Sequence, residues 1–278
     1  MPDPIRSAAR QLRTARRIVR RHRPSVRNAV GPLDDRLVFV LGSPRSGTTF
    51  IARSIASIPG FVDLGEVAAL KAAIPELAAQ DPPAASGRIH RILTIARRLG
   101  LTGGLRGVEQ TPETAFVARA IIIAFPEARL VHAVRDGRDV VCSLLERGWL
   151  SRGRGGRDDA GLAYGHRARF WVEPERREEF ARASDARRAA WAWRRYVGAG
   201  RVVGETAYEL RYEDLTANPE RTAAALARFL GTPPEPLSAA LRGAHSESVG
   251  RFRRDLTPEQ LADVEAEASE LLGELGYL

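Results

Sequence analysis

The segment from residue 37 to residue 58 constrains the fold more than any other part of the sequence. It begins with five consecutive apolar residues, Leu37 to Leu41, which is typical of a strand buried on both faces of a parallel sheet. A loop with two glycines follows, and from about Thr48 to Ile58 the pattern favours a helix. A strand, a glycine-containing loop and a helix in this order indicate an anion-binding turn in an α/β domain.

Three later segments repeat the alternation of strand-like and helix-like patterns. The predicted strands are residues 106–109, 129–134 and 208–212, and each precedes a segment with helical character. A last helix is predicted from Glu259 to Leu272, with Thr257 as its cap and Pro258 in its first turn. We therefore predict one α/β domain with three layers, in which a central parallel sheet is flanked by helices as in P-loop proteins.

The positive charge of the chain is concentrated at its N-terminus. Residues 1–30 contain nine arginines and one aspartate, so this arm carries +8 of the formal net charge of +9. Its apolar residues recur at near-helical spacing, which predicts a basic amphipathic helix that contacts a membrane surface or a partner, or else stays solvated. Residues 31–278 are nearly neutral and form the predicted main domain, in which residues 147–188 are predicted to be an insertion or lid. This distribution argues against a nucleic-acid partner.

The composition excludes several other classes of protein. Cys142 is the only cysteine, so an intramolecular disulfide and any cluster held by several cysteines are excluded. The longest apolar run, residues 120–125, is far shorter than the roughly 20 residues of a membrane-spanning helix. The basic N-terminus lacks the apolar stretch of a secretory signal. We expect a cytoplasmic protein whose membrane contact, if any, is peripheral and made by the basic arm.

The loop after the first strand, Gly42 to Thr49, carries the strongest functional signal. Its glycines let the backbone approach an anion, and the N–H groups at the helix start favour negative charge. A nucleoside triphosphatase has lysine after the second glycine, whereas this chain has Thr48 there, and the cation of the loop is Arg45. Additional hydroxyl groups come from Ser46, Thr48 and Thr49. The alternative interpretation is a structural turn unrelated to anions.

This loop resembles the 5'-phosphosulfate loop of sulfotransferases that use 3'-phosphoadenosine 5'-phosphosulfate (PAPS), whose pattern is Pro-(Arg/Lys)-(Ser/Thr)-Gly-Thr-Thr. A second segment agrees, because Arg135 directly follows the predicted strand 129–134 and Ser143 comes eight residues later, as in the 3'-phosphate segment of that family. The resemblance implies PAPS as co-substrate and no metal. The implied PAPS-binding residues are Arg45, Ser46, Gly47, Thr48, Thr49, Arg135 and Ser143, and Arg45 is also expected to act in catalysis.

Two weaker matches extend the resemblance to the C-terminus. Residues 211–215 resemble the Tyr-Glu-Asp segment of the family, and residues 248–254 resemble its C-terminal phosphate-binding loop. By this resemblance Tyr212 lies near the adenine and Arg251 near the 3'-phosphate. The alternatives are a core aromatic residue at a strand end for Tyr212 and a surface arginine for Arg251.

The acceptor's proton requires a base, for which the sequence offers two candidates. Glu66 lies in a segment that resembles the Gly-Glu segment of tyrosylprotein and glycan sulfotransferases, where the glutamate is the base. Small-molecule sulfotransferases of the cytosolic type use a histidine, for which His90 is the candidate here. We favour Glu66 over His90 and over a simple charge at a helix start. His132 falls inside an apolar strand and is expected to be a core residue with its hydrogen bonds satisfied.

One position departs from the family pattern. Many carbohydrate sulfotransferases have Glu-Lys-(Thr/Ser)-Pro, whereas this chain has Gln110 in place of the lysine. Either Arg45 suffices without that charge or another arginine supplies it.

The sequence as a whole predicts a sulfotransferase that moves a sulfuryl group from PAPS to a hydroxyl or amine. The glutamate base favours a carbohydrate, glycolipid or protein acceptor over a small molecule. The alternative functions are a P-loop kinase, which Thr48 opposes, and a PAPS- or nucleotide-binding module without turnover, which Gln110 favours.

Overall fold

The computed structural model describes residues 37–98, 105–151 and 172–278. The basic arm, residues 1–30, and part of the predicted lid therefore lie outside the described residues. The strands are β1 Leu37–Gly42, β2 Phe61–Gly65, β3 Arg106–Glu109, β4 Arg129–Val134 and β5 Ala207–Arg211. The α-helices are α2 Thr48–Ala56, α3 Ala68–Leu77, α4 Pro82–Arg98, α5 Ala118–Ala124, α6 Gly137–Arg147, α7 Arg177–Arg182, α8 Asp185–Arg201, α9 Tyr212–Ala217, α10 Pro219–Leu230, α11 Glu235–Leu241, α12 Phe252–Asp255 and α13 Pro258–Glu274. Short 3₁₀ helices include η3 Pro112–Val117, η4 Pro174–Arg176 and η6 Ser246–Ser248.

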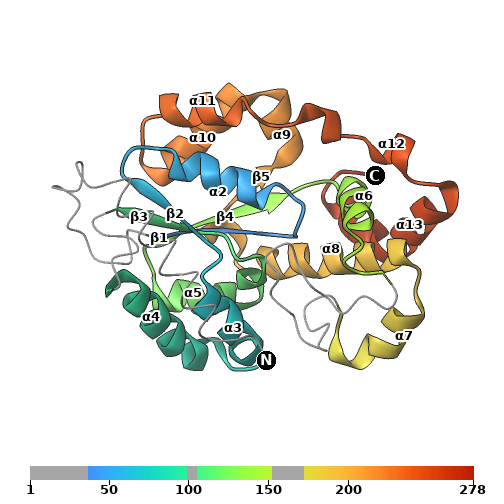
Figure 1. Cartoon of the computed structure of the whole chain (residues 1–278), viewed down its shortest axis with the longest axis horizontal. Helices are drawn as coiled ribbons and strands as arrows, with labels where there is room; N and C mark the ends of the chain where they lie inside the picture. Colours follow the sequence, from blue (N-terminus) through green and yellow to red (C-terminus); the bar gives the residue numbers. More distant parts are fainter. Residues whose placement is uncertain (1–36, 99–104, 152–171) are drawn as a thin grey trace.

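The five strands form one sheet in the order β2-β3-β1-β4-β5, and every neighbouring pair is parallel. Helices cover both faces. In Figure 1, α2, α10 and α11 lie above the sheet and α3, α4, α5 and α8 lie below it. The predicted three-layer α/β fold with a central parallel sheet is confirmed.

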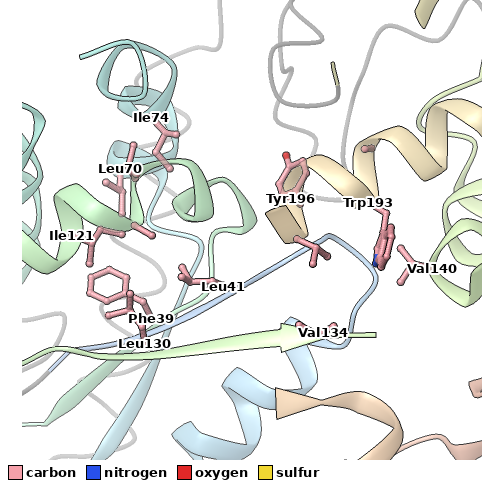
Figure 2. Close-up of a cluster of buried hydrophobic side chains, with 14 of the residues drawn as sticks. Phe39, Leu41, Leu70, Ile74, Ile121, Leu130, Val134, Val140, Trp193 and Tyr196 are labelled. Atoms are coloured by element: carbon pink, nitrogen blue, oxygen red, sulfur yellow. The ribbon is translucent and has the colours of Figure 1, made fainter. Parts of the chain in front are cut away.

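Successive side chains of β1 point to opposite faces of the sheet, and both faces are covered, so a continuous apolar run is needed at its centre. Leu37, Phe39 and Leu41 pack into one apolar cluster, while Val38 and Val40 pack into the other. All five side chains are at most 1% exposed, so neither face of β1 tolerates a polar residue. Figure 2 shows the cluster that contains Phe39 and Leu41. Its other labelled members are Leu70, Ile74, Ile121, Leu130, Val134, Val140, Trp193 and Tyr196.

The predicted elements agree closely with the observed ones. The strands over 37–41, 106–109 and 129–134 are confirmed, and β5 begins and ends one residue earlier than predicted. Helix α2 begins at Thr48 as predicted and ends two residues early, and α13 has the predicted cap, with Thr257 accepting the Gln260 N–H in a capping box. Strand β2 was not predicted. Its run of apolar residues is interrupted by Asp63, whose side chain accepts the N–H of Gly65 at 2.8 Å.

Strand register brings the functional segments to one edge of the sheet. Gly42 at the end of β1 is aligned with Ala133 of β4, so the loops that follow these strands start side by side. On β4, Val134 is aligned with Arg211 at the end of β5. On the other side of β1, Gly65 of β2 is aligned with Glu109 of β3. The segments after all five strands therefore converge at the carboxyl edge, where ligands bind in open α/β folds.

The described part of the predicted insertion, residues 147–188, contains structured elements. These are η4, α7 and the first turn of α8, and Arg188 on α8 donates to the carbonyl oxygens of Phe180, Leu150 and Ala181. The insertion therefore has its own buried anchor, while its role as a lid stays a prediction. Within the described ranges, none of the helices has the length and apolar character needed to cross a membrane.

Candidate active site

The loop between β1 and α2 has the backbone of an anion cradle. Gly42, Arg45 and Gly47 have φ angles of 147°, 72° and 85°, and Arg45 is the one residue other than glycine with positive φ in the described ranges. An L-residue in this region costs roughly 1–2 kcal/mol, a cost that backbone at functional sites often carries. The first turn of α2 has no acidic residue and no side-chain cap, so its N–H groups point toward the loop without a competing carboxylate.

Gly47 is required by a close contact as well as by its backbone angle. A Cβ atom at this position would lie 2.7 Å from the ring of Tyr212. The ring thus lies directly against the loop, and the Tyr212 hydroxyl group bonds with the backbone of His245 at 3.3–3.4 Å. Tyr212 is buried, as expected of a core aromatic, yet it also forms one wall of the loop.

The two segments predicted to bind phosphate meet through their side chains. The Nε atom of Arg45 donates to the Oγ atom of Ser143 at 3.0 Å, although the two residues are 98 positions apart. The Arg45 guanidinium also lies 5.8 Å from the ring centroid of Trp149. Ser143 is about two turns into α6, as predicted, so the side of this helix that carries Ser143 faces the loop.

Arg135 connects three parts of the site. Its guanidinium donates to the carbonyl oxygens of Arg45 and Ser248, the former at 3.3 Å, and lies 4.9 Å from the centroid of the Tyr212 ring. Its backbone carbonyl accepts the indole N–H of Trp193 at 3.1 Å. This side chain is 7% exposed and is therefore held in place on several sides.

Two buried polar atoms at this point have no hydrogen-bond partner among the described residues. They are the Oγ atom of Ser46 and the Nε atom of Arg135. A buried polar atom without a partner costs about 1–3 kcal/mol, so native proteins rarely leave one. Both atoms belong to the predicted PAPS-binding set, and a bound anion would satisfy them. Of the other members, Thr48 is buried and Thr49 is exposed at the start of α2.

Asp139 attaches the C-terminal loop to α6 and was not singled out from the sequence. Its carboxylate accepts the N–H groups of Gly250 at 2.7 Å and Phe252 at 3.0 Å, and it lies 4.0 Å from the Arg135 guanidinium. Burial raises the pKa of Asp139, while these hydrogen bonds and Arg135 oppose that rise. The signal available in the sequence was the spacing of four residues between Arg135, just before α6, and Asp139 in the first turn of α6.

Arg251, which was predicted to lie near the 3'-phosphate, is paired with two carboxylates. Its guanidinium contacts Glu146 on α6 and donates to Asp255 at 2.6 Å. These hydrogen bonds, that to Glu146 first, raise the pKa of Arg251. The structure therefore places Arg251 beside α6 in an ion-pair network. A contact with phosphate, which stays a prediction, would compete with those two carboxylates.

Glu66 follows β2 and forms an ion pair with the only lysine of the chain. The Lys71 ammonium lies 2.6 Å from Glu66 Oε2 and 3.8 Å from Glu113 Oε2. Tyr196 donates to Glu113 at 3.2 Å, and burial raises the Tyr196 pKa well above its ordinary value, so its hydroxyl group stays protonated. The sequence indicated Glu66 but not the group that pairs with it.

The two histidines of the sequence analysis lie away from this carboxylate. His90 is exposed on α4 and stacks on Phe125 at 5.2 Å between ring centroids. Because Phe125 precedes β4, this histidine is at the amino edge of the sheet, opposite the loop. His132 is a core residue as expected, but the expectation that its hydrogen bonds are satisfied is wrong, since its Nε2 atom has no partner among the described residues. Burial lowers its pKa to about 4, so the ring is neutral.

Gln110 occupies the place where the family has lysine. Its backbone N–H donates to the carbonyl oxygen of Gly65 at 3.2 Å, which fixes it beside the segment that carries Glu66. It therefore adds a polar amide to this edge of the sheet and no charge.

Glu109 is buried between the segments that follow β2 and β3. Its Oε1 atom accepts the N–H groups of Val67 at 3.3 Å and Thr111 at 3.0 Å, as well as the Thr111 hydroxyl group. Its Oε2 atom has no partner among the described residues. Burial raises the pKa of Glu109 to about 7, the bonds from Thr111 and Val67 oppose the rise, and the charge of Glu66 adds to it.

This pKa predicts that stability falls as pH rises from about 4.5 to about 7. In that range the unfolded chain releases the proton of residue 109 while the folded protein keeps it, which removes on the order of 3 kcal/mol from the free energy of unfolding. Glu109→Gln should lack this component and lose less stability across the range. Urea unfolding at pH 5, 6, 7 and 8 measures the difference. Glu127→Gln, in an exposed turn before β4, is the control and should behave as the wild type does; equal slopes for all three proteins would contradict the prediction.

Comparisons with known proteins agree on one family. Residues 90–236, more than half of the chain, match the model of the family described as "Sulfotransferase family". No curated protein matches the sequence.

Solved structures show the same fold at low sequence identity. Sulfotransferase STF9 from Mycobacterium avium has a TM-score of 0.54 at 14% identity, with 94% of this chain and 81% of that chain covered. The sulfotransferase domain from the curacin biosynthetic pathway has a TM-score of 0.54 at 16% identity, with 84% of this chain and 96% of that chain covered. The sulfotransferase domain from the Synechococcus PCC 7002 olefin synthase has a TM-score of 0.50 at 17% identity, with 84% of this chain and 94% of that chain covered.

Proposed function

Because the chain belongs to the sulfotransferase family, we propose that it transfers a sulfuryl group from PAPS to a hydroxyl group of a carbohydrate, glycolipid or protein acceptor. The main observation in support of the proposal is the hydrogen bond from Arg45 to Ser143, which joins the two segments that are predicted to bind phosphate. The unpartnered atoms of Ser46 and Arg135 beside it fit an anionic ligand.

In the proposed complex the loop and the first turn of α2 hold the 5'-phosphosulfate. Arg45 lies where its guanidinium neutralises charge that develops on the bridging oxygen as the bond from sulfur to that oxygen breaks. Arg135 and Ser143 bind the 3'-phosphate, and the wall formed by Tyr212 borders the adenosine. The product is 3'-phosphoadenosine 5'-phosphate (PAP).

On the acceptor side we assign the base to Glu66. The acceptor oxygen attacks the sulfur atom in line with the breaking bond, and the carboxylate takes its proton. Two observations support Glu66 over His90: it follows a strand at the carboxyl edge of the sheet, whereas His90 lies at the opposite edge. The family match and Thr48 in the loop oppose a kinase.

We expect PAP to bind roughly 10 to 150 times more tightly than AMP. The two ligands differ by the 3'-phosphate alone, and a hydrogen bond to a charged group contributes about 1.5–3 kcal/mol. Isothermal titration calorimetry measures both affinities, and Ser143→Ala should narrow the difference. Equal affinities would remove the assignment of Arg135 and Ser143.

The acceptor is identified by incubating the protein with ³⁵S-labelled PAPS and extracts of the source cells, followed by analysis of the labelled product. EDTA should leave the transfer unchanged. Magnesium-dependent transfer of phosphate from ATP, with none from PAPS, would support the kinase instead.

A further inference from the structure

The position of the single lysine is unusual for this chain. Of its 43 basic residues, 42 are arginine, and yet Lys71 occupies a site that is 8% exposed beside the proposed base. Arginine presents a broad planar fork, whereas lysine presents a compact ammonium with three donors. The buried site beside Glu66 therefore holds the smaller of the two cations, in a chain whose other basic residues are arginine.

The Lys71 ammonium lies between two carboxylates from separate elements. It is 2.6 Å from Glu66 Oε2 and 3.8 Å from Glu113 Oε2, and Glu113 is itself 1% exposed. The contact with Glu66 is short enough for a charged hydrogen bond, while the contact with Glu113 is an ion pair without one. Helix α3 supplies the cation and η3 the second carboxylate, so both elements are needed to form the arrangement.

Further groups from the neighbouring elements complete the surroundings of Glu66. Glu109 on β3 and Tyr196 on α8 both interact with its charge, and Arg195 beside Tyr196 adds a positive charge on the same helix. Tyr196 stays protonated, whereas Glu109, whose pKa is about 7, is neutral below that pH and adds a second negative charge above it. The other charges near the base are those of Lys71, Glu113 and Arg195. Gln110 adds none.

We propose that Lys71 is a positioning residue for Glu66: its ammonium keeps the carboxylate ionised and fixed toward the acceptor, and Glu113 balances the ammonium when Glu66 holds the acceptor's proton. This inference rests on the proposed role of Glu66. Once the proton has moved to Glu66, that carboxyl no longer carries the charge that faces the buried ammonium, and Glu113 at 3.8 Å keeps a negative charge beside it.

The first test needs no acceptor and uses the wild-type chain. Reductive methylation with ¹³C-formaldehyde labels two amines alone, Lys71 and the α-amino group, and keeps their charge. In ¹³C NMR the Lys71 methyl signal should shift as Glu66 titrates in acid, and this step should disappear in Glu66→Gln but persist in Glu113→Gln. The α-amino signal is the internal reference. A Lys71 signal that titrates identically in wild type and Glu66→Gln would overturn the proposal.

The second test uses the pH dependence of kcat/KM with the identified acceptor. Lys71→Met should move the acidic limb upward by about one pH unit or more, the scale expected when an opposite charge next to a carboxylate is removed. At neutral pH it should lower kcat/KM about tenfold and leave PAP affinity unchanged, and Lys71→Arg should restore part of the loss.

In the Glu66→Gln background, Lys71→Met should have no further effect. An equal loss in both backgrounds would assign Lys71 to folding alone and overturn the proposal. A wild type without any sulfuryl transfer would instead overturn the proposed function, and the NMR titration would still decide the pairing.

Discussion

Arg45→Ala should lower kcat for sulfuryl transfer by roughly 10² to 10³, the usual scale for removing one preorganised group that stabilises the transition state. The structure gives two reasons for a large effect. The guanidinium is already oriented, by its bond to Ser143 at 3.0 Å and by the Trp149 ring, so little reorganisation is needed when charge develops. The backbone at Arg45, with φ 72°, is also part of the loop that is proposed to hold the 5'-phosphosulfate.

The control for this prediction is Arg53→Ala. Arg53 is an exposed arginine on α2, the helix that follows the loop, and its loss should leave both kcat and PAP affinity unchanged. Steady-state kinetics with each variant, together with PAP titration, separates a loss in transfer from a loss in binding. Wild-type turnover in Arg45→Ala would show that the loop does not act on the transferred group.

Much of the sheet and the side of the site that is proposed to bind phosphate were predictable because they depend on local patterns. The apolar run of β1, the glycines of the loop and the Arg135 to Ser143 spacing are each contained in a short stretch of sequence. The parallel sheet then brings these segments together, because the loops after β1 and β4 start side by side when Gly42 and Ala133 are aligned.

The parts that were not predicted depend on contacts between distant segments. In the sequence, Lys71 has the pattern of an ordinary helix residue. Its contact with Glu113 forms only in the fold, because η3 lies about 40 positions later in the chain. Asp139 looks like a charge in the first turn of α6, and its actual role is to accept N–H groups from a loop more than 100 positions away. Strand β2 was overlooked because Asp63 interrupts a short apolar run, although Asp63 bonds within its own strand end. In each case tertiary structure determines the function of the residue and local pattern does not.

The pairing of Arg251 illustrates the same limit on the other side of the site. A basic cluster in a C-terminal loop indicates phosphate binding, but Glu146 on α6 and Asp255 four residues on hold this guanidinium. The spacing of four residues indicates the contact with Asp255, whereas nothing in the local sequence indicates the contact with Glu146.

Glu66→Gln should keep PAP affinity within a few-fold and slow the transfer by about 10² to 10⁴, the range expected for loss of a general base. Glutamine has the shape of glutamate and its amide oxygen can still accept a hydrogen bond from Lys71, so the fold and the donor site should be preserved while the basicity is lost. Pre-steady-state transfer assays and PAP titration measure the two quantities separately.

The comparison with histidine makes this test decisive. His90→Asn should leave turnover unchanged, because His90 stacks on Phe125 at the amino edge of the sheet, far from the loop that follows β1. Glu76→Gln, which removes an exposed carboxylate from α3 with its surface bond to Arg88, is the matched control for a change of glutamate on the same side of the molecule. If Glu66→Gln kept wild-type turnover while His90→Asn abolished it, histidine would be the base, and the preference for a sugar or protein hydroxyl, which rests on a glutamate base, would be lost with the assignment.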